Sequence, residues 1–502
     1  MTSEIGEIDS KVGIWLSVLC GLTIGVIAYA IINTQTFMGY DFQAFWCGAN
    51  VLLVHANPYL TQPLHACEAA HSPAFFIRYP NVTIPAPLPP YALAMFTPLA
   101  LLPFAVARAI WWIVLAVATF AVGRGISKLT GMPPITAFAA SALAVAGPAM
   151  IQGALSPLPI ALTVLAALAL AQRKWNVATV LLGVAMIEPH MVLPACAAVF
   201  LFVPQMRLRL ILAGLCAVML TVLAVGPQVA LAYFTTVLPA HAVSEVNNLG
   251  QDSLASLLYH VGVPAQAAVH LGSLQYLLLA VGGLYLAGRL YKQYGDLSWL
   301  ILLPAAFAVI GGPFIHLSEV AMVIPLACLI VMRRPTIAAT LALILLAIPS
   351  ESVINWALLA APAALICGWF MARSQRHPPL LLSARLPVVM AVGIAIMGAT
   401  VALHKIAAAG ANAQLLPGFH IPDPGPMALS SVSWNAFNSL SFLSGSWWLD
   451  KTMTFVPLVV LVWLTCSEAL AGTSHVVIRR SALTFRRGLE FPGVEPSKEP
   501  RS

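Results

Sequence analysis

Apolar segments of membrane-spanning length recur along the chain, and most are separated by short polar stretches. A helix needs about 20 apolar residues to cross a bilayer. Short segments of alternating polarity, which a membrane barrel requires, do not occur. The pattern therefore predicts an all-α polytopic membrane protein of about 12 to 14 transmembrane helices. The expected spans are residues 12–33, 105–123, 132–150, 157–172, 209–226, 268–288, 297–313, 318–332, 336–349, 354–372, 387–404 and 454–473.

Residues 176–203 are apolar but too short for two comfortable spans. Glu188-Pro189-His190 interrupts them near the middle. Proline lacks the backbone N–H that a continuing helix needs. We expect two half-helices that meet at Pro189.

Composition agrees with a membrane protein, since 60% of the residues are hydrophobic, 8% are charged and the mean hydropathy is +0.91. Soluble proteins carry about 25% charged residues. The net charge of +7 is spread through short loops, which is typical of topology signals rather than of a nucleic-acid surface. We expect one membrane domain over residues 1–473 and a basic, disordered cytoplasmic tail over residues 474–502.

Positive charge predicts the orientation, because Lys and Arg concentrate in cytoplasmic loops. One orientation places 20 of the 24 Lys and Arg inside. It makes both termini cytoplasmic, with residues 12–33 as an uncleaved first helix. The outer stretches are then residues 34–104, 227–262, the turn 311–316 and 405–453. Four basic residues remain on the outer side: Arg78, Arg108, Lys405 and Lys451.

Residues 86–103 are apolar enough to span the membrane, which would invert the later loops. Their many prolines favour a helix that lies in the outer interface instead.

The stretch Gly39-Tyr40-Asp41-Phe42 directly follows the first apolar segment and leads into a helical pattern over residues 42–54. One side of that helix is apolar and the other carries Gln43, Cys47 and Asn50, so we expect it to lie in the membrane plane. Asp41 stands at its N-terminus. It is either the helix cap, where Asp is favoured, or a functional acid, since charges near hydrocarbon are costly unless used.

Several short motifs occur in an order that resembles glycosyltransferase family 87. The first is G-x-D-F-x-x-F-W at residues 39–46, followed by Asn57-Pro58-Tyr59. The resemblance continues through about residue 330. It includes Arg78-Tyr79-Pro80, Pro89-Pro90-Tyr91, Pro98-Leu99-Ala100, Ala109-Ile110-Trp111, Gln152-Gly153 and Asn248 to Ser253-Leu254.

The resemblance implies a GT-C-like helical bundle in a bacterial plasma membrane, with an active site on the outer face. It implies transfer of a hexose, mannose in many members, from a polyprenyl-phosphate donor to a lipid or glycan acceptor of the cell envelope. Inversion at the anomeric carbon needs one general base, and the motif places Asp41 in that role. No cofactor or metal is expected, because the outer loops lack an acid pair that would bridge a nucleotide sugar.

The donor phosphate needs positive charge or hydrogen-bond donors. Arg78 and Arg108 are the outer arginines, and Arg fits phosphate with two parallel bonds. Arg108 would alternatively reach lipid headgroups. His316 follows Gly311-Gly312-Pro313 and resembles a His in the late loop of the family, with Glu319 one helical turn later.

Glu188 departs from the family, which usually has Lys before this proline. The acid argues against phosphate binding there and favours an ion pair with Arg or a contact to the acceptor. Further residues are predicted to be acceptor-binding or structural: Tyr40, Gln43, Tyr59, His190 and Asn248.

The first outer stretch also holds His55, His65, Cys67 and His71, which offer nitrogen and sulfur ligands for zinc. A disulfide between Cys47 and Cys67 is the alternative in an oxidising outer compartment.

A lipid or solute transporter is the rival function. Transporters place charged groups near the membrane centre and show paired broken helices. Here the unusual polar residues gather at one side, and one broken hairpin is evident, which favours the enzyme.

Overall fold

The computed structural model describes residues 39–347, except 143, 145–148 and 150–151, together with residues 421–439 and 445–470. The predicted spans 12–33, 354–372 and 387–404, Lys405 and the tail 474–502 lie outside these residues. The described part consists of helices and loops, with two isolated bridges and no strand. The all-α class is confirmed, and the count of 12 to 14 spans stays a prediction.

Among the described residues, four apolar helical segments are long enough to cross a membrane: Phe104–Thr130, Pro204–Glu245, Ala265–Tyr294 and Lys451–Leu470. The first and third are helices α6 (Phe104–Thr130) and α15 (Ala265–Tyr294), the second contains α12 (Arg207–Ala232), and the fourth is most of α23 (Gly445–Leu470). Large apolar side chains stay exposed along α6, α12 and α15. Because a continuous apolar exterior is unfavourable in water, the molecule is a membrane protein.

The main core forms around α16 (Trp299–Gly311), which is apolar on all sides and buried along nearly its whole length. A helix that is hydrophobic all round belongs inside. It packs against α11 (Pro189–Phe202) and α15. The other shorter helices of this part are α7 (Pro134–Ser141), α9 (Pro157–Ala171), α18 (Ile324–Arg333) and α19 (Ile337–Ala347).

The predicted break at residues 176–203 is confirmed. Helix α10 (Trp175–Ala185) ends before Glu188, and α11 (Pro189–Phe202) begins at the proline. Proline suits the first helical position because no intrahelical partner awaits its missing N–H. The break brings Glu188 and His190 to the junction of the two helices.

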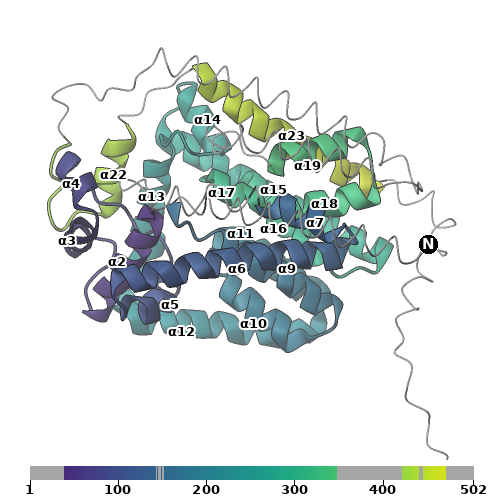
Figure 1. Ribbon diagram of the computed structural model, residues 1–502, viewed down its shortest axis with the longest axis horizontal. Coiled ribbons are helices and arrows are strands. Elements are labelled where there is room, and N and C mark those ends of the chain that lie inside the picture. Colours follow the sequence, from purple (N-terminus) through teal and green to yellow (C-terminus); the bar gives the residue numbers. More distant parts are fainter. Residues whose placement is uncertain are drawn as a thin grey trace, which may run out of the picture.

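A second core holds α2 (Tyr40–Leu53), α3 (Thr61–His71), α4 (Pro73–Arg78) and α5 (Pro90–Ala100). These helices gather at one end of the molecule with α22 (Ser430–Asn438), while α6, α9, α10 and α12 run along its longest axis (Figure 1). Helix α5 has 11 residues and rises ~16 Å. It is therefore too short to cross the bilayer alone, and its place in the outer interface stays a prediction.

The side of α2 that carries Gln43 and Cys47 is covered by other residues, and the place of this helix in the membrane plane stays a prediction. Gln43 and Cys47 are both buried, because α3 covers this side of α2. Cys47 forms a disulfide with Cys67. The Gln43 amide donates to the Glu68 carbonyl at 2.6 Å. The disulfide prediction is confirmed, and it excludes Cys67 as a zinc ligand.

The remaining elements carry polar residues toward this same end. Helix α12 kinks at Gly226 and leads through the π-helical turn η3 (Tyr233–Val237) into α13 (Leu238–Glu245). Helix α13 packs on α22. Next come α14 (Leu254–His260), α17 (Leu317–Val320) and the 3-10 turn η4 (Ala321–Val323), and another 3-10 turn, η2 (Pro204–Met206), precedes α12.

Three arginines that the charge pattern places on the cytoplasmic side contact polar residues of other helices or loops. Arg209 donates to Asn176 at 2.7 Å, and Arg333 forms an ion pair with Asp296 at 2.9 Å. Arg334 pairs with Glu468 of α23. These contacts join loops that the charge pattern assigns to one side of the membrane.

Candidate active site

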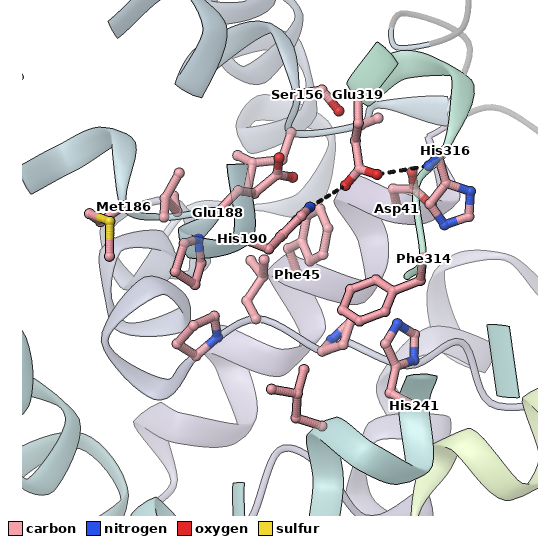
Figure 2. Close-up of a pocket in the computed structure, with 18 of the residues that line it drawn as sticks. Asp41, Phe45, Ser156, Met186, Glu188, His190, His241, Phe314, His316 and Glu319 are labelled. Atoms are coloured by element: carbon pink, nitrogen blue, oxygen red, sulfur yellow. Dashed lines mark hydrogen bonds and ion pairs between the residues drawn. The ribbon is translucent and has the colours of Figure 1, made fainter. Parts of the chain in front are cut away.

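A cavity of about 830 Å³ opens between the start of α2, the α10–α11 junction, α12, α13 and the loop before α17. Figure 2 shows Asp41, Glu188, His190, His316 and Glu319 around it. These residues come from segments far apart in sequence. The cavity therefore gathers most of the acids and histidines that the sequence singled out.

Gly39 positions Asp41. Its φ is +82°, and a Cβ on it would lie 2.5 Å from the Trp112 ring. It is also the N-cap of α2, since the Gln43 N–H donates to its carbonyl at 2.9 Å. The alternative that Asp41 caps the helix was wrong, because α2 begins at Tyr40, two residues before the predicted start at residue 42. Asp41 lies in the first turn and lines the cavity.

The Asp41 carboxyl is half-buried and lies outside the candidate spans. Burial raises its pKa from 3.8 to about 7; His316 opposes this shift, while Glu245 and Glu319 add to it. A carboxylate with a pKa near neutrality is a better proton acceptor than an ordinary Asp. The site thus provides the electrostatic setting of a general base.

Glu319 joins two histidines on opposite sides of its carboxylate (Figure 2). Its Oε1 lies 3.1 Å from His190 Nε2, and its Oε2 accepts the backbone N–H of His316 at 2.7 Å. Glu319 is the third residue of α17, so this contact is half of a capping box. The backbone of the His316 loop is fixed by the same acid that orients His190.

The His316 side chain faces the cavity with 40% of its surface exposed. Its Nε2 lies 3.4 Å from Glu245 and 2.9 Å from the Gln251 amide. Burial disfavours the charged ring, but the surrounding carboxylates, first that of Glu245, outweigh it and raise the His316 pKa above 6.5. His316 can therefore present a positive charge to an anion in the cavity.

Glu188 lines the same cavity and is 7% exposed. Its Oε2 has no hydrogen-bond partner among the described residues. The predicted ion pair with an Arg is not present in this part of the chain, where no salt bridge of Glu188 occurs. An acid kept without a partner at a cavity points to a role with a ligand.

Residues 88–313 match the sequence model of glycosyltransferase family 87. This region belongs to glycosyltransferase family 87. The resemblance drawn from the motifs is confirmed, and the protein is a glycosyltransferase. Searches of curated proteins and of solved structures gave no match.

The family 87 match contains one part of the site. Glu188, His190 and Glu245 lie inside the matched residues, whereas Asp41 and Glu319 lie outside them. Residues from inside and from outside the matched region line the same cavity. The fold of this glycosyltransferase therefore adds residues from either side of the matched region to one site.

Some predicted site residues stay outside the cavity. Tyr59 is buried and donates to the Leu88 carbonyl at 2.8 Å, which makes it a structural residue, and Gln43 is held in the α2–α3 contact. Arg108 is exposed on α6 with its guanidinium 5.5 Å from the Phe104 ring centre. Arg78 ends α4, and its side chain lies outside the described part.

Tyr40 and Asn248 do line the cavity. Asn248 also donates to Glu245 Oε2 at 2.9 Å. Asn248 therefore supports a neighbouring acid and also faces the cavity.

The sequence analysis missed Glu245. Its carboxylate accepts from Trp434 of α22 at 2.5 Å, from Asn248 and from Gln251 at 3.0 Å. A signal was present, since Glu245 and Asp252 are the only acids between residues 189 and 295. Trp434 had no such signal, because it lies 189 residues away.

The pair Asp252–Lys451 was also missed. Lys451 Nζ lies 3.0 Å from Asp252 Oδ1, and both side chains are 2% exposed. The Asp252 N–H donates to the Ile315 carbonyl at 2.6 Å, next to His316. The pair therefore ties α23 to the loop that supports the site.

Proposed function

We propose that this glycosyltransferase moves a hexose, in keeping with its motifs a mannose, from a polyprenyl-phosphate donor to a lipid or glycan acceptor. Asp41 is the general base, and the anomeric carbon inverts. The observation that carries the proposal is the Asp41 carboxyl at the wall of the cavity, with a pKa raised to about 7. In this proposal the site faces the outer side of a bacterial plasma membrane, and both termini are cytoplasmic.

The chemistry needs one proton acceptor and one stabilised leaving group. Asp41 takes the proton of the acceptor hydroxyl while its oxygen bonds to the anomeric carbon. The bond from that carbon to the phosphate oxygen breaks, and its electron pair leaves with the polyprenyl phosphate. One carboxylate suffices for inversion by this direct displacement.

The shape of the cavity supports a lipid-linked donor. One part is lined by apolar and small residues of α10, α11 and α12: Gly183, Leu193, Leu210, Ala213, Gly214, Ala217 and Val218. The segment that contains α12 is the least buried of the candidate spans. A polyprenyl chain can therefore pass from the bilayer along α12 and place its phosphate near the polar residues.

The phosphate would meet imidazoles rather than arginines. No Lys or Arg lines the cavity within the described part of the chain, and Arg108 is exposed elsewhere. His316 is the best-placed positive group, because its ring faces the cavity and carboxylates favour its charged form. We assign donor binding to His316, supported by His190.

The test uses purified protein with a radiolabelled polyprenyl-phosphate hexose and membrane lipid extract. Labelled product from the wild type and none from Asp41→Asn supports the proposal. Transfer that is unaffected by Asp41→Asn contradicts the role of the base. Movement of the donor across liposomes without any transfer would favour the transporter.

A further inference from the structure

The cavity contains an excess of acids over fixed positive charges. Four carboxylates and three imidazoles line it: Asp41, Glu188, Glu245, Glu319, His190, His241 and His316. No Lys or Arg is among the described lining residues. Glu245 is satisfied by Trp434 and neighbouring amides. Glu319 is bonded to His190 and to the His316 N–H. At the α10–α11 junction, Glu188 is therefore the acid whose charge lacks comparable compensation.

Three of these side chains converge at the α10–α11 junction. One ligand atom each of Glu188, His190 and Glu319 lies within 4.8 Å of the others. Ligands held at ~2.1 Å from one metal ion lie roughly 3–4 Å apart. Small rotations of the side chains are therefore enough to bring all three to a shared ion.

Glu188 gives an independent indication of a ligand. The residue is 7% exposed, yet its buried Oε2 bonds to no described residue. An ionised carboxylate in such a place is costly unless it is paired or coordinates a metal. Its position at the cavity wall, beside His190 and Glu319, supplies the place for such an ion.

We propose that Glu188, His190 and Glu319 bind a divalent cation at the wall of the active-site cavity. One imidazole and two carboxylates suit ions that accept both nitrogen and oxygen, and Mn²⁺ serves as the probe for such an ion. Three protein ligands leave coordination positions open toward the cavity.

The role of the ion rests on the proposed function. A bound cation would contact the donor phosphate and neutralise the charge that develops on it as the sugar departs. It would add to the positive charge of His316, because no Lys or Arg is among the described lining residues. The sequence offered no metal motif, because Glu319 lies 129 residues from His190.

The direct test measures Mn²⁺ binding by electron paramagnetic resonance on detergent-purified protein that was stripped with EDTA. No donor is needed. We expect one bound Mn²⁺ per chain in the wild type and at least tenfold weaker binding in Glu188→Gln. This variant loses no hydrogen bond of the described residues, so it should unfold at the wild-type temperature. Glu188→Asp keeps the charge but shortens the side chain, and weaker binding by it indicates coordination.

Asp41→Asn is the matched control, because it removes a carboxylate from the same cavity but outside the cluster; it should keep its Mn²⁺. Absence of bound Mn²⁺ in the wild type, or equal binding by the wild type and Glu188→Gln, overturns the site. Transfer that EDTA leaves unchanged overturns its role at the phosphate. Bound Mn²⁺ without transfer under any condition supports the site and contradicts the proposed function.

Discussion

Asp41→Asn separates catalysis from folding. Asn keeps the size of the side chain and removes its ability to accept a proton as a base. General base catalysis contributes about 10²–10⁴ in rate, so we expect kcat/KM to fall by that factor. The wild-type rate should rise with pH through about 7, because only the ionised carboxylate of Asp41 accepts the proton.

Asp41→Asn should lower the rate of transfer but increase the stability of the fold. The pKa of Asp41 is 3.8 in its ordinary state and about 7 in the fold. Between these values the folded protein retains a proton that the unfolded chain has lost, so the free energy of unfolding decreases as pH rises. The difference of about three between the two pKa values, at ~1.36 kcal/mol for each, corresponds to a loss of at most about 4 kcal/mol in the free energy of unfolding. Because water in the cavity screens the half-buried charge, we expect the free energy of unfolding to decrease by only ~1–2 kcal/mol.

The assay compares thermal unfolding in detergent at pH 5 and pH 8, together with transfer. The Asp41→Asn variant should equal or exceed the wild type in stability, and its advantage should be larger at pH 8. Asp423→Asn is the control, since Asp423 is exposed and lies outside the cavity. Transfer within tenfold of the wild type, or an advantage that shrinks at pH 8, would refute the reasoning.

Three further changes test how the site is supported. Lys451→Met leaves the buried Asp252 carboxylate without its ammonium partner. We expect this change to cost about 3–5 kcal/mol of folding stability and to lower the melting temperature. An unchanged melting temperature would contradict this. Gly39→Ala should destabilise more than Gly131→Ala, because both have positive φ but only Gly39 meets a ring at 2.5 Å; equal losses would show that the close contact is unimportant. Ala217→Phe narrows the apolar part of the cavity and should raise the KM for long-chain donors more than it lowers kcat; kinetics with short and long prenyl chains would check this.

Much of the helical framework could be predicted from the sequence. Helices α6, α9, α15 and α16 correspond to predicted spans, and the break before Pro189 occurs where expected. Such features depend on contacts within a few residues, on apolar length and on the missing N–H of proline. The cap of α2 was missed because Gly39 adopts the left-handed conformation, which pattern alone did not reveal.

The motif analysis identified Asp41, Glu188, His190, His316 and Glu319 one by one. It could not show that they share a cavity. The charge pattern also favoured Arg108, which the fold leaves exposed on α6. The position of Arg108 along the chain did not show whether its side chain would reach the site, because each side chain of a helix points in only one direction.

By itself the sequence determined a helical membrane protein of a glycosyltransferase family with an acid shortly after its first apolar segment. Length, hydropathy and short motifs are local properties, so they can be recognised without the fold. Only the tertiary structure decided that Glu319 meets His190, that Trp434 bonds to Glu245, and that the charged groups among the described lining residues are acids and imidazoles, without an arginine. These pairings join residues more than 100 positions apart, and they depend on how helices pack rather than on any segment alone.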